Sequence, residues 1–222
     1  MTIQQPKVIF LDAVGTLFGV RGSVGEVYSA IAQRFGVTVP SDPLNQAFIQ
    51  AFAATNPPVF PGCYPDEIPQ CEFEWWRVIA QRTFQQVGVL HQFVDFDDFF
   101  DQLYNYFATA EPWFIYPDVL PALQAWQQIG IEMGIVSNFD SRLDYVLDAL
   151  NLKEFFTSIT VSTQAGVAKP DSRIFSIALQ KHLCEPQEAW HIGDSFTQDF
   201  QGAKAAGIRA ILLERKNQML GA

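Results

Sequence analysis

An α/β fold built around a doubly wound parallel sheet is the architecture that this sequence predicts. After residue 113, short apolar runs rich in β-branched residues alternate with segments of helical spacing. Strands separated by helices of this length imply right-handed crossovers and a parallel sheet covered on both faces. The composition agrees, because 49% of the 222 residues are hydrophobic and only 17% are charged, which is enough apolar surface for a substantial core.

The first strand is expected from Lys7 to Asp12, where a buried run of β-branched and aromatic residues ends in turn-forming residues. Asp118 to Gln128 has helical spacing and stops at Gly130, a residue typical of helix C-termini. The pattern then predicts, in order, a strand at 131–137, a helix at 141–150, a strand at 158–162, a helix at 172–182, a strand at 189–193, a helix at 196–206 and a strand at 209–213.

Residues of about 20 to 113 do not follow this alternation. They are helical and aromatic in pattern, with an irregular proline-rich stretch from Pro57 to Pro69 between two helical parts. We therefore expect a core formed by residues 1–19 and 114–222, and an inserted, mainly helical domain at 20–113.

Charge and cysteine content exclude several classes of protein. The net charge of −10, without a cluster of Lys and Arg, disfavours a nucleic-acid partner. The apolar run from Val8 to Leu11 is too short for a signal-peptide core or a membrane span, so we expect neither export nor membrane insertion. The three cysteines are odd in number and lack CxxC spacing, which indicates neither a disulfide framework nor a zinc cluster and favours a reduced cytoplasm. The sequence carries no signal for the oligomeric state.

Polar residues follow several of the expected strands, and in doubly wound sheets ligands bind at the carboxyl ends of the strands. A carboxylate there can act as a nucleophile, and Mg²⁺ takes one or two carboxylates together with carbonyls, waters and substrate oxygens. The ordinary alternatives are a helix N-cap or a turn for each acid and an exposed loop position for the lysine. The residues concerned are Asp12, Ser137, Asn138, Lys169, Asp194 and Asp199.

Taken together, four segments resemble a known family. FLDAVGTLF (10–18), IVSN (135–138), AKPDSRIF (168–175) and HIGDSFTQD (191–199) are similar, in this order, to the four motifs of the haloacid dehalogenase (HAD) superfamily. The resemblance covers the core, implies a Rossmann-like HAD architecture, and makes the insert similar to the helical cap of that family. The runs VSNFDSRL and GDSFTQDFQGA are most similar to its hydrolase-like branch.

The resemblance also implies roles for individual residues. Asp12 would be the nucleophile and Lys169 would hold the phosphoryl group of a small phosphorylated metabolite, which the enzyme hydrolyses through an aspartyl-phosphate. Asp199 would either support the metal from nearby or position Lys169. The implied substrate-binding residues are Thr16, Ser137, Asn138 and Lys169. The implied Mg²⁺ ligands are Asp12, the backbone carbonyl of Val14, Asp194 and Asp199.

Val14 departs from the pattern of the family's phosphatases. Those enzymes carry DxDGT, where the second Asp protonates the leaving alcohol and then activates water. Here the position holds valine, and a general acid/base is worth about 10² to 10⁴ in rate. Three alternatives follow. The leaving group needs no proton, as in the 2-haloacid dehalogenases, or the cap supplies the acid, or the protein has lost efficient catalysis and kept a binding or interaction role.

The fourth motif weighs against a dehalogenase, because those enzymes need no metal and replace its acids, whereas Asp194 and Asp199 are present here. Two aromatic residues, Trp75 and Trp76, together with Phe73, are expected to form either a substrate wall or the cap's own core. His182 and His191 are interpreted as structural. Candidate acids from the cap are Asp66, Glu67 and His91, with Tyr64 nearby.

Overall fold

The computed structural model describes residues 5–215 and confirms the predicted parallel sheet. Its five strands run in the order β5-β4-β1-β6-β7, and all adjacent pairs are parallel. Every strand expected from the sequence forms, with bounds that differ by two residues at most. The bounds are β1 Val8–Leu11, β4 Glu132–Ser137, β5 Ser158–Val161, β6 Ala189–Gly193 and β7 Arg209–Leu212.

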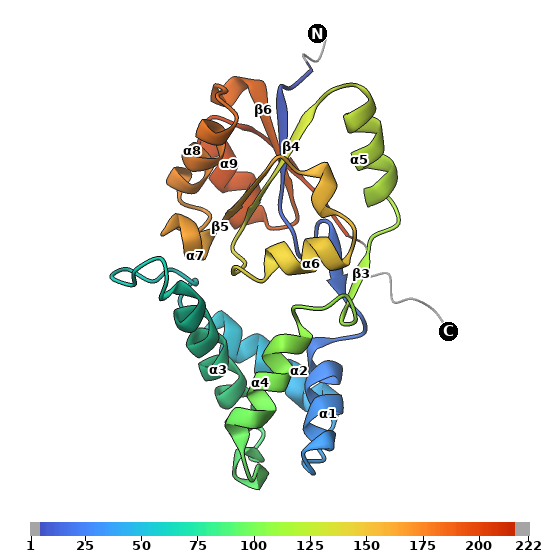
Figure 1. The fold of residues 1–222 in the computed structure, drawn as a ribbon, viewed down its shortest axis with the longest axis vertical. Helices are drawn as coiled ribbons and strands as arrows, with labels where there is room; N and C mark the ends of the chain where they lie inside the picture. Colours follow the sequence, from blue (N-terminus) through green and yellow to red (C-terminus); the bar gives the residue numbers. More distant parts are fainter. Residues whose placement is uncertain (1–4, 216–222) are drawn as a thin grey trace. The chain divides into compact units, whose positions relative to one another are not determined.

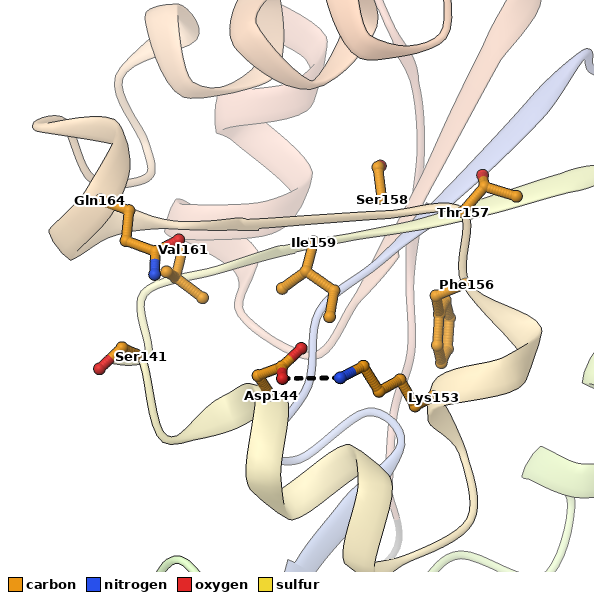
Figure 2. Close-up of a pocket in the computed structure, with 9 residues that line it drawn as sticks. All are labelled: Ser141, Asp144, Lys153, Phe156, Thr157, Ser158, Ile159, Val161 and Gln164. Atoms are coloured by element: carbon orange, nitrogen blue, oxygen red, sulfur yellow. Dashed lines mark hydrogen bonds and ion pairs between the residues drawn. The ribbon is translucent and has the colours of Figure 1, made fainter.

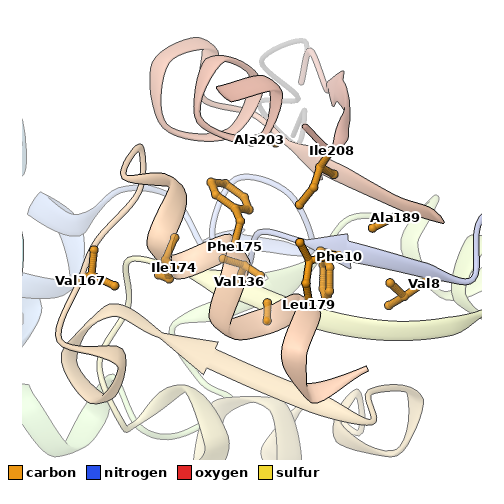
Figure 3. Packing of buried hydrophobic residues seen from close by; sticks show 11 residues of the cluster. Val8, Phe10, Val136, Val167, Ile174, Phe175, Leu179, Ala189, Ala203 and Ile208 are labelled. Atoms are coloured by element: carbon orange, nitrogen blue, oxygen red, sulfur yellow. The ribbon is translucent and has the colours of Figure 1, made fainter. Parts of the chain in front are cut away.

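Helices cover both faces of this sheet, with α8 and α9 on one side and α5 on the other (Figure 1). On the α8 face, Phe10 and Val136 from neighbouring strands pack with Phe175 of α8 and Ala203 of α9, all of them buried (Figure 3). The helical elements of this part are α5 Val119–Gln128, α6 Leu143–Ala149, α7 Ser162–Ala165, α8 Ser172–Lys181 and α9 Gly202–Ala205, with 3₁₀ turns η2 Lys153–Phe155 and η3 Pro186–Glu188.

The single helix expected at 196–206 is wrong in detail. The segment begins as a π-helix, η4 Phe196–Gln201, and only then continues as α9. The amide of Phe200 donates to the carbonyl of Ser195, five residues earlier, at 3.1 Å. Such wide turns are frequent at functional sites, and here the turn contains the buried residue Asp199.

The chain divides into two compact units. Of the described residues, the first unit takes in the chain up to Gly19, Pro58–Pro61, and the chain from Phe114 to Arg215. The second comprises Val20–Pro57 and Gly62–Trp113. Strands β2 Phe18–Val20 and β3 Trp113–Ile115 pair as a separate two-stranded sheet. The helices of the second unit are α1 Val24–Arg34, α2 Ser41–Ala53, α3 Ile68–Gln86, η1 Leu90–Gln92 and α4 Phe96–Tyr106.

An aromatic core holds the second unit together. Phe84 of α3 is fully buried, and its ring lies 5.0 Å from that of Phe93, 5.1 Å from that of Phe99, and stacked at 5.9 Å on that of Tyr28. These contacts join α1, α3 and α4, so the apolar periodicity of the insert is accounted for by its own core. No helix within residues 5–215 combines the length and the apolar character that crossing a membrane requires.

The cysteine pattern indicated no disulfide framework, and the structure differs from this expectation at one pair. Cys63, in the loop before α3, and Cys71, in the first turn of that helix, form a disulfide. A single bridge between residues eight positions apart has no framework spacing that a sequence pattern would reveal. The cysteine content therefore no longer favours a reducing compartment, and the cytoplasmic location remains a prediction.

Candidate active site

The carboxylates of Asp12, Asp194 and Asp199 converge at the carboxyl edge of the sheet. One oxygen from each lies within 4.8 Å of the others. Asp12 directly follows β1 and Asp194 directly follows β6, and these strands are neighbours with Leu11 beside Ile192. The amide of Asp12 extends this pairing by donating to the carbonyl of Ile192 at 3.0 Å. The adjacent strand ends therefore fix the separation of the two acids.

Lys169 provides the positive charge of this cluster. Its residue is 2% exposed, and its Nζ donates to Asp12 Oδ1 at 2.7 Å and to Asp199 Oδ1 at 2.5 Å. Burial alone would lower the pKa of this ammonium, but the charges of Asp12 and Asp199 outweigh burial and raise it. The side chain of Asn138 fixes the lysine backbone, because its Oδ1 accepts from the amide at 2.7 Å and its Nδ2 donates to the carbonyl at 2.9 Å. Lys169 is thus a charged, immobilised donor.

Asp199 is held from three directions. Besides Lys169, its Oδ1 contacts His191 Nε2 at 2.9 Å, and its Oδ2 accepts from the amide of Ser195 at 3.0 Å. A Cβ at Gly193 would overlap this carboxyl group, so the close approach requires glycine. Burial opposes ionisation, yet the hydrogen bond from His191 and the charge of Lys169 prevail and lower the pKa of Asp199. Asp199 is therefore an ionised anchor for Lys169.

His191 is fully buried beneath this anchor. Burial lowers the pKa of its imidazole despite the neighbouring carboxylate. Because an ionised carboxylate only accepts hydrogen bonds, Nε2 is the donor in the contact with Asp199. The edge of the imidazole also meets the Phe175 ring at 5.0 Å. Among the residues described, its Nδ1 has no hydrogen-bond partner. The role interpreted as structural is therefore a hydrogen bond from the His191 ring that helps to hold the Asp199 carboxylate in place.

Asp194 differs from the other two acids because it is exposed. Its pKa rises to about 6 through partial removal from water and through repulsion by Asp12 and Asp199. Its carboxyl group lies against Gly15, where φ is +87° and an added Cβ would overlap the acid. Three carboxylates facing one ammonium leave an excess of negative charge, and oxygen donors of this kind fit a hard divalent cation such as Mg²⁺.

The turn after β1 connects Asp12 to β2, and its residue Gly15 lies against Asp194. The amide of Gly15 donates to Phe18 and the amide of Leu17 to Ala13, both at 2.8 Å. Val14 is half-buried and its aliphatic side chain offers no proton donor where the family's phosphatases have an acid. Thr16 is buried, and its Oγ1 has no partner within the described part of the chain. The turn is closed by its own backbone hydrogen bonds, and position 14 carries no acid.

Ser137, the last residue of β4, is also buried. Because β4 pairs with β1, Ser137 and Asp12 end adjacent strands at the same edge, and Asn138 follows directly. The core residues singled out in the sequence therefore gather at one edge of the first unit. A buried ion pair nearby in the chain was not predicted from the sequence: Arg142 Nη2 donates to Asp140 Oδ2 at 2.7 Å.

The cap candidates all belong to the second unit. Tyr64, Asp66 and Glu67 are exposed in the loop before α3, where the amide of Tyr64 donates to Glu67 Oε2 at 2.9 Å, and His91 is exposed in η1. That one of these residues acts as the general acid remains a prediction. The aromatic candidates divide, because Phe73 packs on Phe100 and Tyr104 whereas Trp75 and Trp76 pack on each other and on Phe52.

His182 has the structural role expected for it. Its ring lies beneath Gly134, with Nε2 2.7 Å from Ser158 Oγ and Nδ1 2.6 Å from Glu132 Oε2. A pocket of about 400 Å³ lies nearby, beside α6 and β5 (Figure 2). Within it, Asp144 and Lys153 already form an ion pair at 2.7 Å and Ile159 points toward them, so this pocket holds no reactive cluster comparable to the acids.

A parallel α/β sheet that brings three carboxylates and a buried lysine together at its strand ends is compatible with a hydrolase. The chain belongs to the haloacid dehalogenase-like hydrolases, whose family profile matches residues 6–207. It is 34% identical to mouse (Mus musculus) haloacid dehalogenase-like hydrolase domain-containing protein 3 over 209 residues, which is 94% of this chain and 82% of that protein.

Solved structures show the same fold at low sequence identity. A HAD phosphatase from Thermococcus onnurineus matches with a TM-score of 0.63 and 20% identity, over 96% of this chain and 88% of that one. L-2-haloacid dehalogenase from Xanthobacter autotrophicus matches with a TM-score of 0.67 and 18% identity, over 96% of this chain and 80% of that one. The fold is therefore common to enzymes of both activities.

Proposed function

We propose that the protein is a Mg²⁺-dependent phosphatase that hydrolyses a small phosphorylated metabolite through an aspartyl-phosphate on Asp12. The observation that carries the proposal is the cluster of three carboxylates around the buried ammonium of Lys169. A halide-releasing enzyme needs no cation, so the excess of negative charge at Asp194 favours a phosphatase over a dehalogenase. Specificity would reside in loops and in the second unit, as is usual for a shared fold.

In the first step, an oxygen of Asp12 attacks phosphorus and the bond from phosphorus to the leaving oxygen breaks. Lys169 holds Asp12 Oδ1 at 2.7 Å and thereby directs the carboxylate. An ammonium has three N–H donors, and the bonds to Asp12 and Asp199 leave one for a phosphoryl oxygen. Ser137, Asn138 and Thr16 line the same edge and are proposed to contact the substrate.

In the second step, water attacks the aspartyl-phosphate, which releases inorganic phosphate and restores Asp12. Asp12, Asp194 and the Val14 carbonyl would hold Mg²⁺, and Asp199 would act through Lys169. When bound, the metal supplies positive charge that offsets the anionic nucleophile and the phosphoryl oxygens. Position 14 gives the leaving oxygen no proton, so the account favours substrates whose leaving group departs readily as an anion.

The lack of an acid at Val14 also supports a second function, in which the scaffold binds a phosphorylated ligand without efficient turnover. Phosphate release separates the two. Acetyl phosphate and p-nitrophenyl phosphate would be tested with Mg²⁺ and with a chelator, using the wild type, Asp12→Asn and the matched control Asp144→Asn. We expect release that needs both Mg²⁺ and Asp12, whereas binding of these ligands without release would establish the second function instead.

A further inference from the structure

Arg215, beyond the end of β7, reaches back to the nucleophile turn. Its Nη2 donates to the carbonyl of Thr16 at 2.5 Å, and its Nη1 donates to Asp118 Oδ1 at 2.5 Å. Its guanidinium carbon also lies 4.0 Å from the centre of the Tyr116 ring. Three separate contacts therefore hold one side chain, which has a side-chain exposure of 19%.

These contacts join two segments of the first unit that are about a hundred residues apart in sequence. Thr16 lies just before β2, and Tyr116 and Asp118 lie just after β3. The amide of Tyr116 donates to the carbonyl of Leu17 at 3.2 Å. Two consecutive carbonyls of the turn thus accept hydrogen bonds from residues outside it, that of Thr16 from Arg215 and that of Leu17 from Tyr116.

We propose that Arg215 is a positioning residue for the turn that carries Asp12 and Val14. The inference deepens the proposed function, because it names a residue that acts on the reacting carboxylate through the backbone. A charge-assisted hydrogen bond to the Thr16 carbonyl limits rotation of the peptide that closes the turn. A shift of the turn would displace both the nucleophile and the carbonyl proposed to bind Mg²⁺, and small displacements of this kind reduce rates strongly.

The arrangement suits arginine specifically. A guanidinium is planar, so its two terminal nitrogens can bond to Thr16 and Asp118 while its face stacks on Tyr116. Lysine has one nitrogen and no flat face, so it can keep only part of this set. Asp118 offsets the charge of Arg215, which makes long-range attraction of the substrate a minor part of its action.

The test compares Arg215→Ala, Arg215→Lys and the control Arg209→Ala. Arg209 also lies over an aromatic ring, that of Trp190 at 4.7 Å, but it is the first residue of β7, whereas Arg215 lies beyond the end of that strand. Hydrogen exchange of the Gly15 and Leu17 amides reports on the turn directly, because both donate within it. Turnover of acetyl phosphate and Mg²⁺ affinity by calorimetry report on its consequences.

For Arg215→Ala we expect about tenfold faster exchange at both amides, unchanged exchange in β1, and Mg²⁺ affinity reduced severalfold. We also expect kcat to fall about tenfold with KM changed less than about twofold, because Arg215 touches the turn and not the substrate. Arg215→Lys should lie between alanine and wild type, and Arg209→Ala should match wild type.

Unchanged exchange at Gly15 and Leu17 in Arg215→Ala, or the same change in Arg209→Ala, would overturn the proposal. A wild type without turnover would remove the proposed function but not this test, since amide exchange and Mg²⁺ affinity are still measurable. A fall in kcat without faster exchange at the turn would also count against positioning through the backbone.

Discussion

The strand ends of the first unit and the aromatic core of the second unit bury different kinds of side chain. At the strand ends of the first unit the buried groups are charged or polar, and Lys169, Asp199 and His191 are at most 2% exposed. The second unit buries aromatic rings such as Phe84 and Phe99. Burial of charge is costly unless it is paired, whereas burial of rings stabilises a fold directly. The difference indicates that mutations should separate chemistry in the first unit from stability in the second.

The largest effect is expected at the nucleophile. Asp12→Asn keeps the shape of the side chain but cannot attack phosphorus, so turnover should fall by about 10³-fold or more. Loss of one charge from a repelling cluster should leave the fold intact. Phosphate release measures the loss of turnover, and chemical denaturation measures whether the fold is intact. Turnover within about tenfold of wild type would rule out a covalent intermediate on Asp12.

The next effect concerns stability in the aromatic core. Phe84→Ala removes a fully buried ring that contacts Tyr28, Phe93 and Phe99, and should lower the free energy of unfolding of the second unit by about 3 to 5 kcal/mol. The exposed ring of Phe196 offers the control, for which Phe196→Ala should change stability by less than about 0.5 kcal/mol. Mg²⁺ affinity at a temperature where Phe84→Ala is folded should equal that of wild type. If Phe84→Ala lost as much Mg²⁺ affinity as Asp194→Asn, the predicted separation between chemistry in the first unit and stability in the second would be contradicted.

A smaller effect should come from supplying the missing acid. Val14→Asp should raise the hydrolysis of alkyl phosphates at least about tenfold, or roughly 1.4 kcal/mol, and that of acyl phosphates much less. The reason is that only a poor leaving group needs a proton as it departs. Val14→Asn is the matched control, with similar size and no acid. A gain that does not depend on the leaving-group pKa, or an equal gain in Val14→Asn, would favour an acid from the second unit.

The smallest effect is a pH dependence of stability in the metal-free protein. The pKa of Asp194 is about 6 in the folded state against an ordinary value of 3.8. The folded state therefore binds this proton more tightly, and the free energy of unfolding rises as pH falls from 7 toward 4. The full shift would correspond to about 3 kcal/mol, and exposure of the group to water reduces this to about 1 kcal/mol.

Asp194→Asn should therefore be more stable than wild type by about 1 kcal/mol at pH 7 in a chelator, and similar to wild type near pH 4. Urea denaturation at the two pH values gives this difference. Saturating Mg²⁺ should reverse the order at pH 7, because it binds the folded wild type preferentially. A variant less stable than wild type at pH 7 without metal would show that Asp194 is not under repulsion.

The core could be predicted well because its strands are short apolar runs with clear ends. β1, β4 and β6 each bring a polar residue to one edge by the rule for parallel sheets, so Asp12, Ser137 and Asp194 could be placed together from sequence. The π-helical turn at 196–201 could not be predicted, because its apolar spacing is that of an ordinary helix. The Cys63–Cys71 bridge was missed because its closure depends on the path of a loop.

Contacts between distant segments also escaped prediction. Arg215 has no motif around it, and only the path of the chain after β7 brings it to Thr16 and Tyr116. The position of Lys169 was expected from its loop, and a positioning role of Asp199 was one of two implied by the resemblance, but the burial of Lys169 and the path that brings Asp199 to it depend on the π-helical turn. Local sequence pattern was therefore enough to predict where the strand-end residues lie. The positions of the groups that hold them depend on tertiary packing and could not be predicted in the same way.

The most direct test of the central claim is mass spectrometry of the covalent intermediate. The wild type would be incubated with acetyl phosphate and Mg²⁺, quenched in acid, and mapped by peptide analysis. The account predicts one added phosphoryl group on the peptide containing residues 10–18, located at Asp12, absent in Asp12→Asn and absent when a chelator replaces Mg²⁺. Hydrolysis of acetyl phosphate by the wild type with the phosphoryl group on another residue, or with equal labelling of Asp12→Asn, would contradict it.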